Sequence, residues 1–156
     1  MVLHKPPGFQ VDQGCSGPTS RSWLLSRYLQ GLLTVRQPLP ADVQHHRGLM
    51  HRLDAPSSGL VLAAKTYSAY YDLLLQVSAG KVVRDYVVLC HGWVPRGRNE
   101  VIAGVLWSCE DQGPSSVSGR GKPSCTRLRL LAHGLRKSEP VSLVAVRIAT
   151  GRRHQI

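Results

Sequence analysis

The sequence predicts an α+β fold, a largely antiparallel mixed sheet with flanking helices. Segments that alternate apolar and polar residues fill the second half of the chain, and short Gly- or Pro-containing loops separate them. Two segments in the first half instead repeat their apolar residues with a helical period. Consecutive strands joined by short loops favour antiparallel pairing. The 156 residues, 42% of them hydrophobic, are enough for one domain, 1–156, with a buried core.

The first half is expected to contain two strands and two helices. Residues 1–5 predict a short strand that a rigid Pro-Pro-Gly turn closes. An amphipathic helix begins after a Ser cap near Ser22, with its apolar residues at Trp23, Leu25, Tyr28, Leu29, Leu32 and Leu33. Residues 60–64 predict a buried strand. Thr66 is expected to cap a second helix, and Gly80 to end it.

The second half is expected to be all strand and loop. The alternating segments predict strands at 81–92, 100–107, 126–132 and 141–149. Residues 108–123 are rich in Gly, Ser and Pro and predict a long loop, and 134–140 a hairpin loop. Within the first of these strands, the two-residue period places Arg84 and Tyr86 on one face.

The charge of the chain indicates a polyanionic partner. Twenty Lys and Arg residues stand against nine Asp and Glu residues, a formal net charge of +11. Such an excess is better explained by nucleic acid than by any need of the fold. No apolar run approaches the roughly 20 residues of a membrane span, so we expect no membrane partner.

The cysteine and histidine spacing indicates neither a metal site nor a disulfide framework. The four cysteines form no C-x-x-C pair and lie at Cys15, Cys90, Cys109 and Cys125. The loose cluster of His45, His46 and His51 lacks the tight spacing of about four ligands that a structural zinc site needs. We therefore expect no metal and a reduced, intracellular compartment, with cytoplasm, nucleus and organelle left open.

The stretch from His51 to Leu60, HRLDAPSSGL, carries the strongest signal for chemistry. Strand geometry would place Arg52 and Asp54 on one face and Leu53 on the other, just before a Pro-Ser-Ser-Gly turn. The backbone would hold an aspartate at such a strand tip, which suits a nucleophile. On these residues alone, a surface Arg–Asp ion pair is the alternative.

Four blocks, in order along the chain, resemble the RluA-type pseudouridine synthase family. The first is the KPPG turn, which begins with Lys5, and the second is HRLDAPSSG, with Ser57 at a usual Thr position. The third contains Tyr86 and has Arg84 where Lys is usual; the last is TGRRHQI, with Arg153 in place of Thr. The chain resembles a catalytic domain of this family truncated at both ends.

The resemblance implies an enzyme that isomerises uridine to pseudouridine in rRNA or tRNA without a cofactor. It assigns Asp54 as the catalytic carboxylate, Tyr86 as the phenol that stacks on the uracil, and Arg152 as the cation paired with Asp54. Arg52 would fill the space left by the extruded nucleotide, because base flipping leaves a gap in the stack. Further RNA contacts are implied at Arg84, Lys5 and His154.

Two other functions remain open at this point. A catalytically silent RNA-binding relative would keep the basic surface, although the intact Asp54, Tyr86 and Arg152 argue against it. A carboxylate-based glycosidase would need a second acid opposite Asp54, and no other acidic residue lies in a comparable motif. We expect a monomer. The choice of RNA and uridine, and the choice between covalent attack and proton abstraction from the sugar, are left open.

Overall fold

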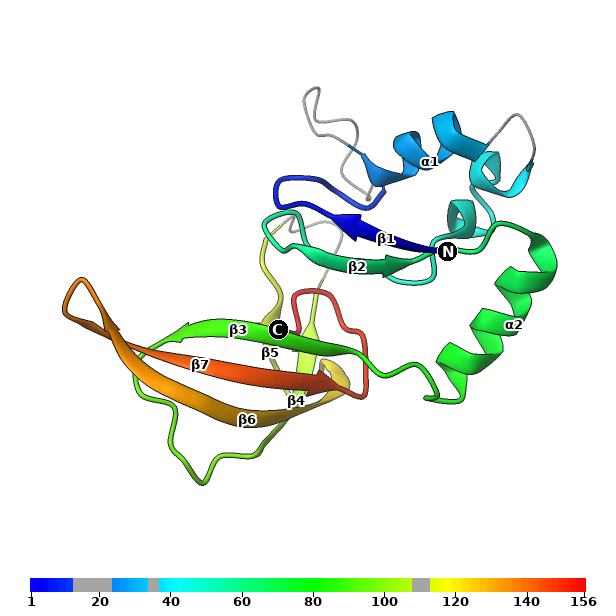
Figure 1. Cartoon of the computed structure of the whole chain (residues 1–156). Helices are drawn as coiled ribbons and strands as arrows, with labels where there is room; N and C mark the ends of the chain where they lie inside the picture. Colours follow the sequence, from blue (N-terminus) through cyan, green and yellow to red (C-terminus); the bar gives the residue numbers. More distant parts are fainter. Residues whose placement is uncertain (13–23, 34–36, 108–112) are drawn as a thin grey trace. The chain divides into compact units, whose positions relative to one another are not determined.

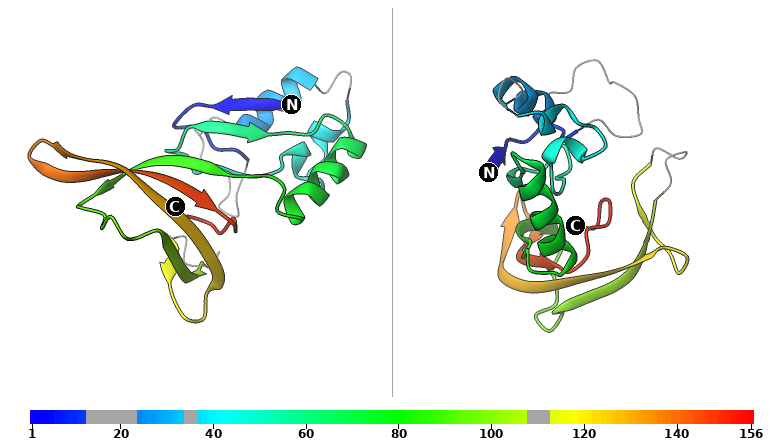
Figure 2. Two further views of the ribbon diagram at one scale, coloured as in Figure 1. Left: turned by 60° about the horizontal axis from the view of Figure 1, so that its bottom comes forward. Right: turned by 90° about the vertical axis from the view of Figure 1, so that its right-hand side faces the viewer.

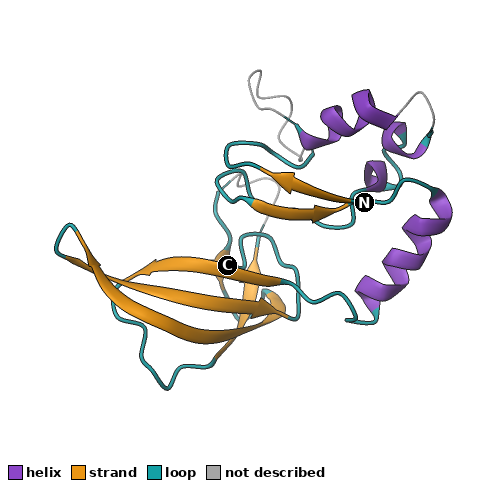
Figure 3. Ribbon diagram, in the orientation of Figure 1, coloured by secondary structure: helices purple, strands orange, loops and turns teal. Residues whose placement is uncertain are grey.

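The computed structural model describes residues 1–12, 24–33, 37–107 and 113–156, which form two compact units, Met1–Lys81 and Val82–Ile156. Each unit is described by itself. Helices and antiparallel strands are both present (Figure 3), so the predicted α+β class is confirmed. The strands form two separate sheets, one in each unit, and both helices belong to the first unit.

The first unit combines a two-stranded sheet with two α-helices (Figure 1). Strand β1 (Val2–Lys5) pairs antiparallel with β2 (Gly59–Leu62), so chain segments more than fifty residues apart lie side by side. Between them come α1 (Leu25–Leu33) and two short 3-10 helices, η1 (Leu39–Ala41) and η2 (His46–Gly48). Helix α2 (Tyr67–Ser78) follows β2. The most deeply buried apolar side chains of the unit are Leu29, Leu39, Val61 and Ala63.

The local signals at α2 are confirmed, whereas those at α1 and β2 are confirmed in part. The hydroxyl of Thr66 accepts a hydrogen bond from the amide of Ala69 at 3.3 Å, and Gly80 has φ +68° just beyond the helix. Helix α1 begins at Leu25, and the Ser cap predicted for it lies outside the described residues. Strand β2 is not buried throughout, because Leu60 is exposed while Val61 is fully buried.

A polar cluster links the turn before η2 to α2. The carboxylate of Asp42 accepts hydrogen bonds from the hydroxyl of Tyr67 (3.0 Å) and the amide of Gln44 (2.9 Å), and it lies 2.7 Å from His45 Nδ1. The other ring nitrogen of His45 lies 2.8 Å from the hydroxyl of Tyr71. Burial raises the pKa of Asp42, but the hydrogen bonds from Tyr67 and His45 outweigh it and lower the pKa below the ordinary 3.8.

The lowered pKa of Asp42 predicts a pH-dependent contribution to stability. A carboxylate with a lowered folded-state pKa contributes above its unfolded value, and the contribution is lost as the pH falls through the folded value. We expect the wild-type chain to be more stable than Asp42→Asn above pH 3.8, and the difference to shrink below it. Urea unfolding of both proteins at a series of pH values measures this. A difference that does not change with pH would contradict the assignment.

The second unit is a five-stranded antiparallel sheet in the order β3-β7-β6-β4-β5. Its strands are β3 (Asp85–His91), β4 (Glu100–Leu106), β5 (Ser116–Val117), β6 (Lys122–Arg136) and β7 (Glu139–Ile148). Figure 2 shows the strong curvature of β6. The core of the unit consists of Val144, Val146 and Ile148 with Tyr86, Val88 and Leu128 packed against them.

Of two loop predictions in this unit, one is wrong and the other is confirmed only in part. The hairpin loop predicted at 134–140 contracts to Lys137 and Ser138, both at positive φ (50° and 67°), and β6 and β7 stay paired up to the turn. A two-residue turn with both residues at positive φ matches the twist of paired strands, which lets the ladder extend. The long loop predicted at 108–123 is confirmed in part: its residues 108–112 lie outside the described part of the chain, and the rest is loop except for β5 and the start of β6.

Candidate active site

The Asp54 segment is a turn, not the predicted strand. Residues 51–54 have no ladder partner in a named strand, and the amide of Ser57 donates to the carbonyl of Asp54 at 3.0 Å. The alternation of exposure nevertheless holds, because Leu53 is buried while Arg52 is exposed and Asp54 partly exposed. The leucine therefore anchors the turn in the core, and the two charged residues lie on its outer side.

The KPPG turn holds the residue that follows Asp54. The carbonyl oxygen of Ala55 accepts hydrogen bonds from the amide of Gly8 (2.7 Å) and from Lys5 Nζ (3.2 Å). Gly8 has φ +85°, a conformation that glycine adopts without strain. Two residues from the start of the chain thus fix the backbone beside the candidate carboxylate.

Lys5 is fully buried and binds only backbone oxygens among its described hydrogen bonds. Its ammonium donates to the carbonyls of Phe9 (2.7 Å), Pro6 (3.1 Å) and Ala55. Burial lowers the pKa of Lys5, and the negative charge of Asp54 acts in the opposite direction. The RNA contact expected of Lys5 does not fit this placement. The side chain instead supports the Asp54 turn from inside.

In the second unit, Tyr86 lies on β3, and Arg84 directly precedes this strand. Tyr86 pairs with Val146 of β7 and is half-buried against the apolar core of the sheet. Arg84 donates from Nη2 to the carbonyl of Ala149 at 3.2 Å. A Cβ atom added at Gly151 would lie only 2.6 Å from Nη1 of Arg84, which is too close for a side chain. Arg84 therefore packs against the backbone that leads into the fourth block, and only Gly fits beside it unless the guanidinium shifts.

Gln155 organises the turn that presents Arg152. Its Oε1 accepts hydrogen bonds from the amide of Arg152 and the hydroxyl of Thr150, both at 2.9 Å, and its Nε2 donates to two acceptors on β6. The guanidinium of Arg152 donates from Nε to the carbonyl of Pro123 at 2.9 Å. Sequence reasoning missed Gln155 as a positioning residue. Its place inside the fourth block was the available signal.

The predicted site residues thus form two sets. Arg52, Asp54 and Lys5 belong to the first unit. Those in the second unit are Tyr86, Arg84, Arg152 and His154. In the first set the structure links Lys5 to the Asp54 turn, and in the second it links Arg84 and Arg152 to the turn at 149–152. His154 Nδ1 accepts a hydrogen bond from the amide of Ser115 at 3.2 Å.

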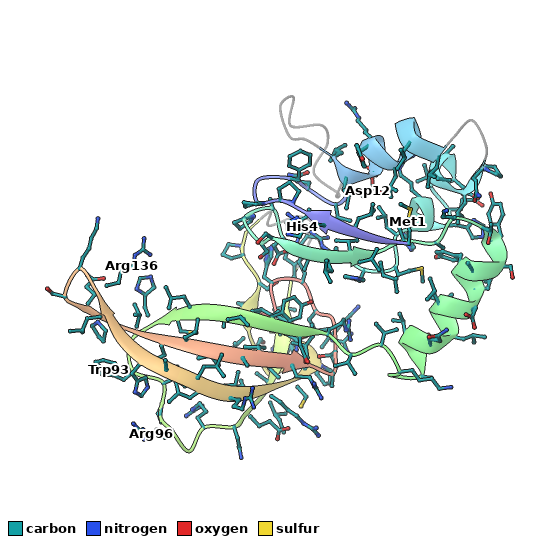
Figure 4. The ribbon with its side chains drawn as sticks, in the orientation of Figure 1. Met1, His4, Asp12, Trp93, Arg96 and Arg136 are labelled. Atoms are coloured by element: carbon teal, nitrogen blue, oxygen red, sulfur yellow. The ribbon has the colours of Figure 1, made fainter. Side chains whose placement is uncertain are left out.

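Positive charge is concentrated in the second unit, which holds more than half of the Lys and Arg residues. Figure 4 labels two exposed examples, Arg96 in the β3–β4 connection and Arg136 next to the β6–β7 turn. Within the described parts of the chain, no three His, Cys, Asp or Glu residues are grouped to hold a metal ion. No helix there is long and apolar enough to cross a membrane.

Comparison with known proteins gives a consistent result. A family model described as RNA pseudouridylate synthase matches residues 1–156. "Ribosomal large subunit pseudouridine synthase D" of Buchnera aphidicola is 29% identical over 158 residues, covering 100% of this chain and 46% of the relative. "Ribosomal large subunit pseudouridine synthase C" of Yersinia pestis is 32% identical over 158 residues and covers 100% and 44%.

A solved structure has the same fold. "Human RNA Pseudouridylate Synthase Domain Containing 1" aligns with a TM-score of 0.72 at 24% identity, covering 99% of this chain and 57% of that one. The chain therefore spans about half the length of the relatives that it matches.

Proposed function

Because the chain belongs to the RNA pseudouridylate synthase family, we propose that it isomerises uridine to pseudouridine in RNA, with rRNA or tRNA as the substrate. The observation that carries the proposal is the Asp54 turn. Its carboxylate lies on the outer side of a backbone that Lys5 and Gly8 hold through the neighbouring carbonyl. A reacting group must be held in one geometry to lower a barrier, and this turn supplies that restraint.

The reaction breaks the N-glycosidic bond of uridine, turns the base over and joins it again to the sugar through carbon. No atom is gained or lost and no redox change occurs, so the chemistry calls for no cofactor. It does call for one ionised carboxylate that either attacks the nucleoside or removes a proton from the sugar. We assign that carboxylate to Asp54.

The other roles follow the resemblance. Tyr86 stacks on the uracil ring, and its place against the apolar core of the sheet supports a fixed orientation of the phenol. By the same resemblance, Arg152 is assigned as the cation that partners the Asp54 carboxylate. The exposed Arg52 occupies the gap left by the flipped nucleotide.

Two of the residues first assigned to RNA take different roles in the proposal. Lys5 supports the Asp54 turn from the interior. Arg84 braces the turn before Arg152 through the carbonyl of Ala149, and His154 remains a candidate RNA contact. Sequence-independent attraction to the RNA backbone then comes from the excess of exposed Lys and Arg residues.

A direct assay tests the proposal. Purified protein is incubated with rRNA and tRNA, and pseudouridine is mapped by chemical modification followed by primer extension. We expect new extension stops at defined uridines with the wild-type chain. RNA binding without any pseudouridine, at equal level in wild type and Asp54→Asn, would instead identify a catalytically silent RNA-binding relative.

A further inference from the structure

Arg153 is one of several arginines of the second unit that have no carboxylate partner among the described residues, and it stacks on a tryptophan. The guanidinium carbon of Arg153 lies 3.9 Å from the centroid of the Trp107 ring. By contrast, Arg147 donates two hydrogen bonds of 2.7 Å to Asp85, and Arg127 lies 4.0 Å from Glu100. Among the described residues, Arg153 has neither a side-chain hydrogen bond nor an ion pair to offset its charge.

This contact, in which the Arg153 guanidinium stacks on the Trp107 ring, brings together two hydrogen-bond donors that have no acceptor in the described parts of the chain. Arg153 Nε and Trp107 Nε1 are both buried at the atom level and make no hydrogen bond. The Arg153 side chain as a whole is only partly buried. Both nitrogens are out of reach of a ligand, so the part of the guanidinium that solvent can reach is the part available for binding. A cation with no acidic partner among the described residues suits an anionic ligand.

The backbone at Arg153 is also fixed from a second direction. The hydroxyl of Ser115, just before β5, donates to the carbonyl of Arg153 at 2.8 Å, and the amide of Ser115 donates to His154 Nδ1. His154 has φ +54°, an uncommon conformation for a residue with a side chain. Ser115 therefore fixes the backbone at Arg153 and the residue that follows it.

We propose that Arg153, stacked on Trp107, is a binding element for a phosphate of the RNA backbone. This inference rests on the proposed function, because it takes RNA as the ligand. A stacked guanidinium keeps its in-plane N–H groups free to bind two phosphate oxygens, and stacking reduces the conformational entropy lost on binding.

The test measures binding of a fluorescently labelled, uridine-containing RNA stem-loop to the full chain over a range of salt concentrations. We expect Arg153→Gln to weaken binding about tenfold at low salt, the scale of one charge-assisted hydrogen bond. The slope of log K against log salt should fall by about 0.7, as expected when one phosphate contact of single-stranded RNA is lost. In turnover assays KM should rise while kcat stays unchanged.

Three further variants separate this role from bulk charge and from folding. Arg27→Gln removes the same charge from an exposed position on α1, and we expect no change in affinity or slope. Arg153→Lys should keep the wild-type slope but bind more weakly, because an ammonium neither stacks as well nor binds two oxygens in a fixed geometry. Trp107→Leu should weaken binding about threefold through loss of the cation–π contact. Circular dichroism and thermal unfolding check that each variant is folded.

The outcomes are distinct. If Arg153→Gln binds RNA with the same affinity and slope as Arg27→Gln, or lowers kcat without raising KM, the phosphate role is overturned. Wild-type protein that binds RNA but forms no pseudouridine refutes the proposed function. The slopes of log K against log salt for wild type and Arg153→Gln still decide the role of Arg153 in that case. Wild-type protein that does not bind RNA refutes both.

Discussion

Replacing Asp54 by Asn is expected to abolish pseudouridine formation and to leave RNA affinity unchanged. The amide is nearly the same shape as the carboxylate but carries no negative charge, so it can neither attack the sugar nor accept its proton. We expect the rate to fall at least about 10³-fold, within the range assigned to a positioned catalytic group. Single-turnover assays with the variant in excess over RNA measure the loss in the chemical step.

We expect the Asp54→Asn variant to fold as the wild type does. The turn is held by backbone groups, through the bonds from Gly8 and Lys5 to the carbonyl of Ala55 and from Ser57 to the carbonyl of Asp54. The matched control is Asp72→Asn on the exposed side of α2, where, among the described residues, the carboxylate accepts a hydrogen bond only from Gln76 in the same helix. Asp72→Asn should keep full activity. Substantial activity in Asp54→Asn would exclude a catalytic role for this carboxylate.

Replacing Lys5 by Met is expected to destabilise the protein by about 3 kcal/mol, because carbonyl oxygens in the interior lose their donor. Methionine matches the length of the lysine chain but offers no N–H group to the carbonyls of Pro6, Phe9 and Ala55. Urea unfolding measures the change in free energy. Lys65→Met, at an exposed position after β2, is the control and should cost little.

The pH dependence provides a second readout for Lys5. Its pKa is lowered by burial below the ordinary 10.5, so the unfolded chain binds more protons between the lowered value and 10.5. Stability contributed at this site therefore rises with pH through that window. We expect the free-energy difference between wild type and Lys5→Met to widen there. If Lys5→Met unfolds at the same urea concentration as wild type throughout, the ammonium does not support the Asp54 turn.

Lys5 also illustrates the limit of reading the site from sequence. The KPPG block is recognisable in the sequence, and the resemblance implies an RNA contact at Lys5. Its three acceptors include Ala55, fifty residues away, and only the folded chain brings that carbonyl within reach. The same holds for Arg84, whose guanidinium donates to the carbonyl of Ala149, just after the neighbouring strand β7.

Signals between near neighbours in sequence were sufficient for much of the fold. Thr66 and Gly80 bound α2, Gly8 turns the chain after β1, and strand alternation placed Arg84 and Tyr86 on one face, which the structure shows to be the face of β3 that packs on the core at Tyr86. The prediction of a hairpin loop at 134–140 failed because strand pairing decided where the strands end. The β6–β7 ladder continued to its two-residue turn because each added pair satisfies backbone groups, whatever the local composition.

By itself, the sequence determined the α+β class, since caps, turns and periodicity depend on near neighbours. It also contained the four blocks that resemble the family, and this resemblance selected Asp54, Tyr86 and Arg152 as the residues to test. Only the tertiary structure decided that Lys5 is buried beneath the Asp54 turn, that Gln155 fixes the backbone of Arg152, and that Arg153 stacks on Trp107. These contacts join segments far apart in the chain, except for that of Gln155. Their partners are fixed by packing and by the need to satisfy buried polar groups, which no local pattern specifies.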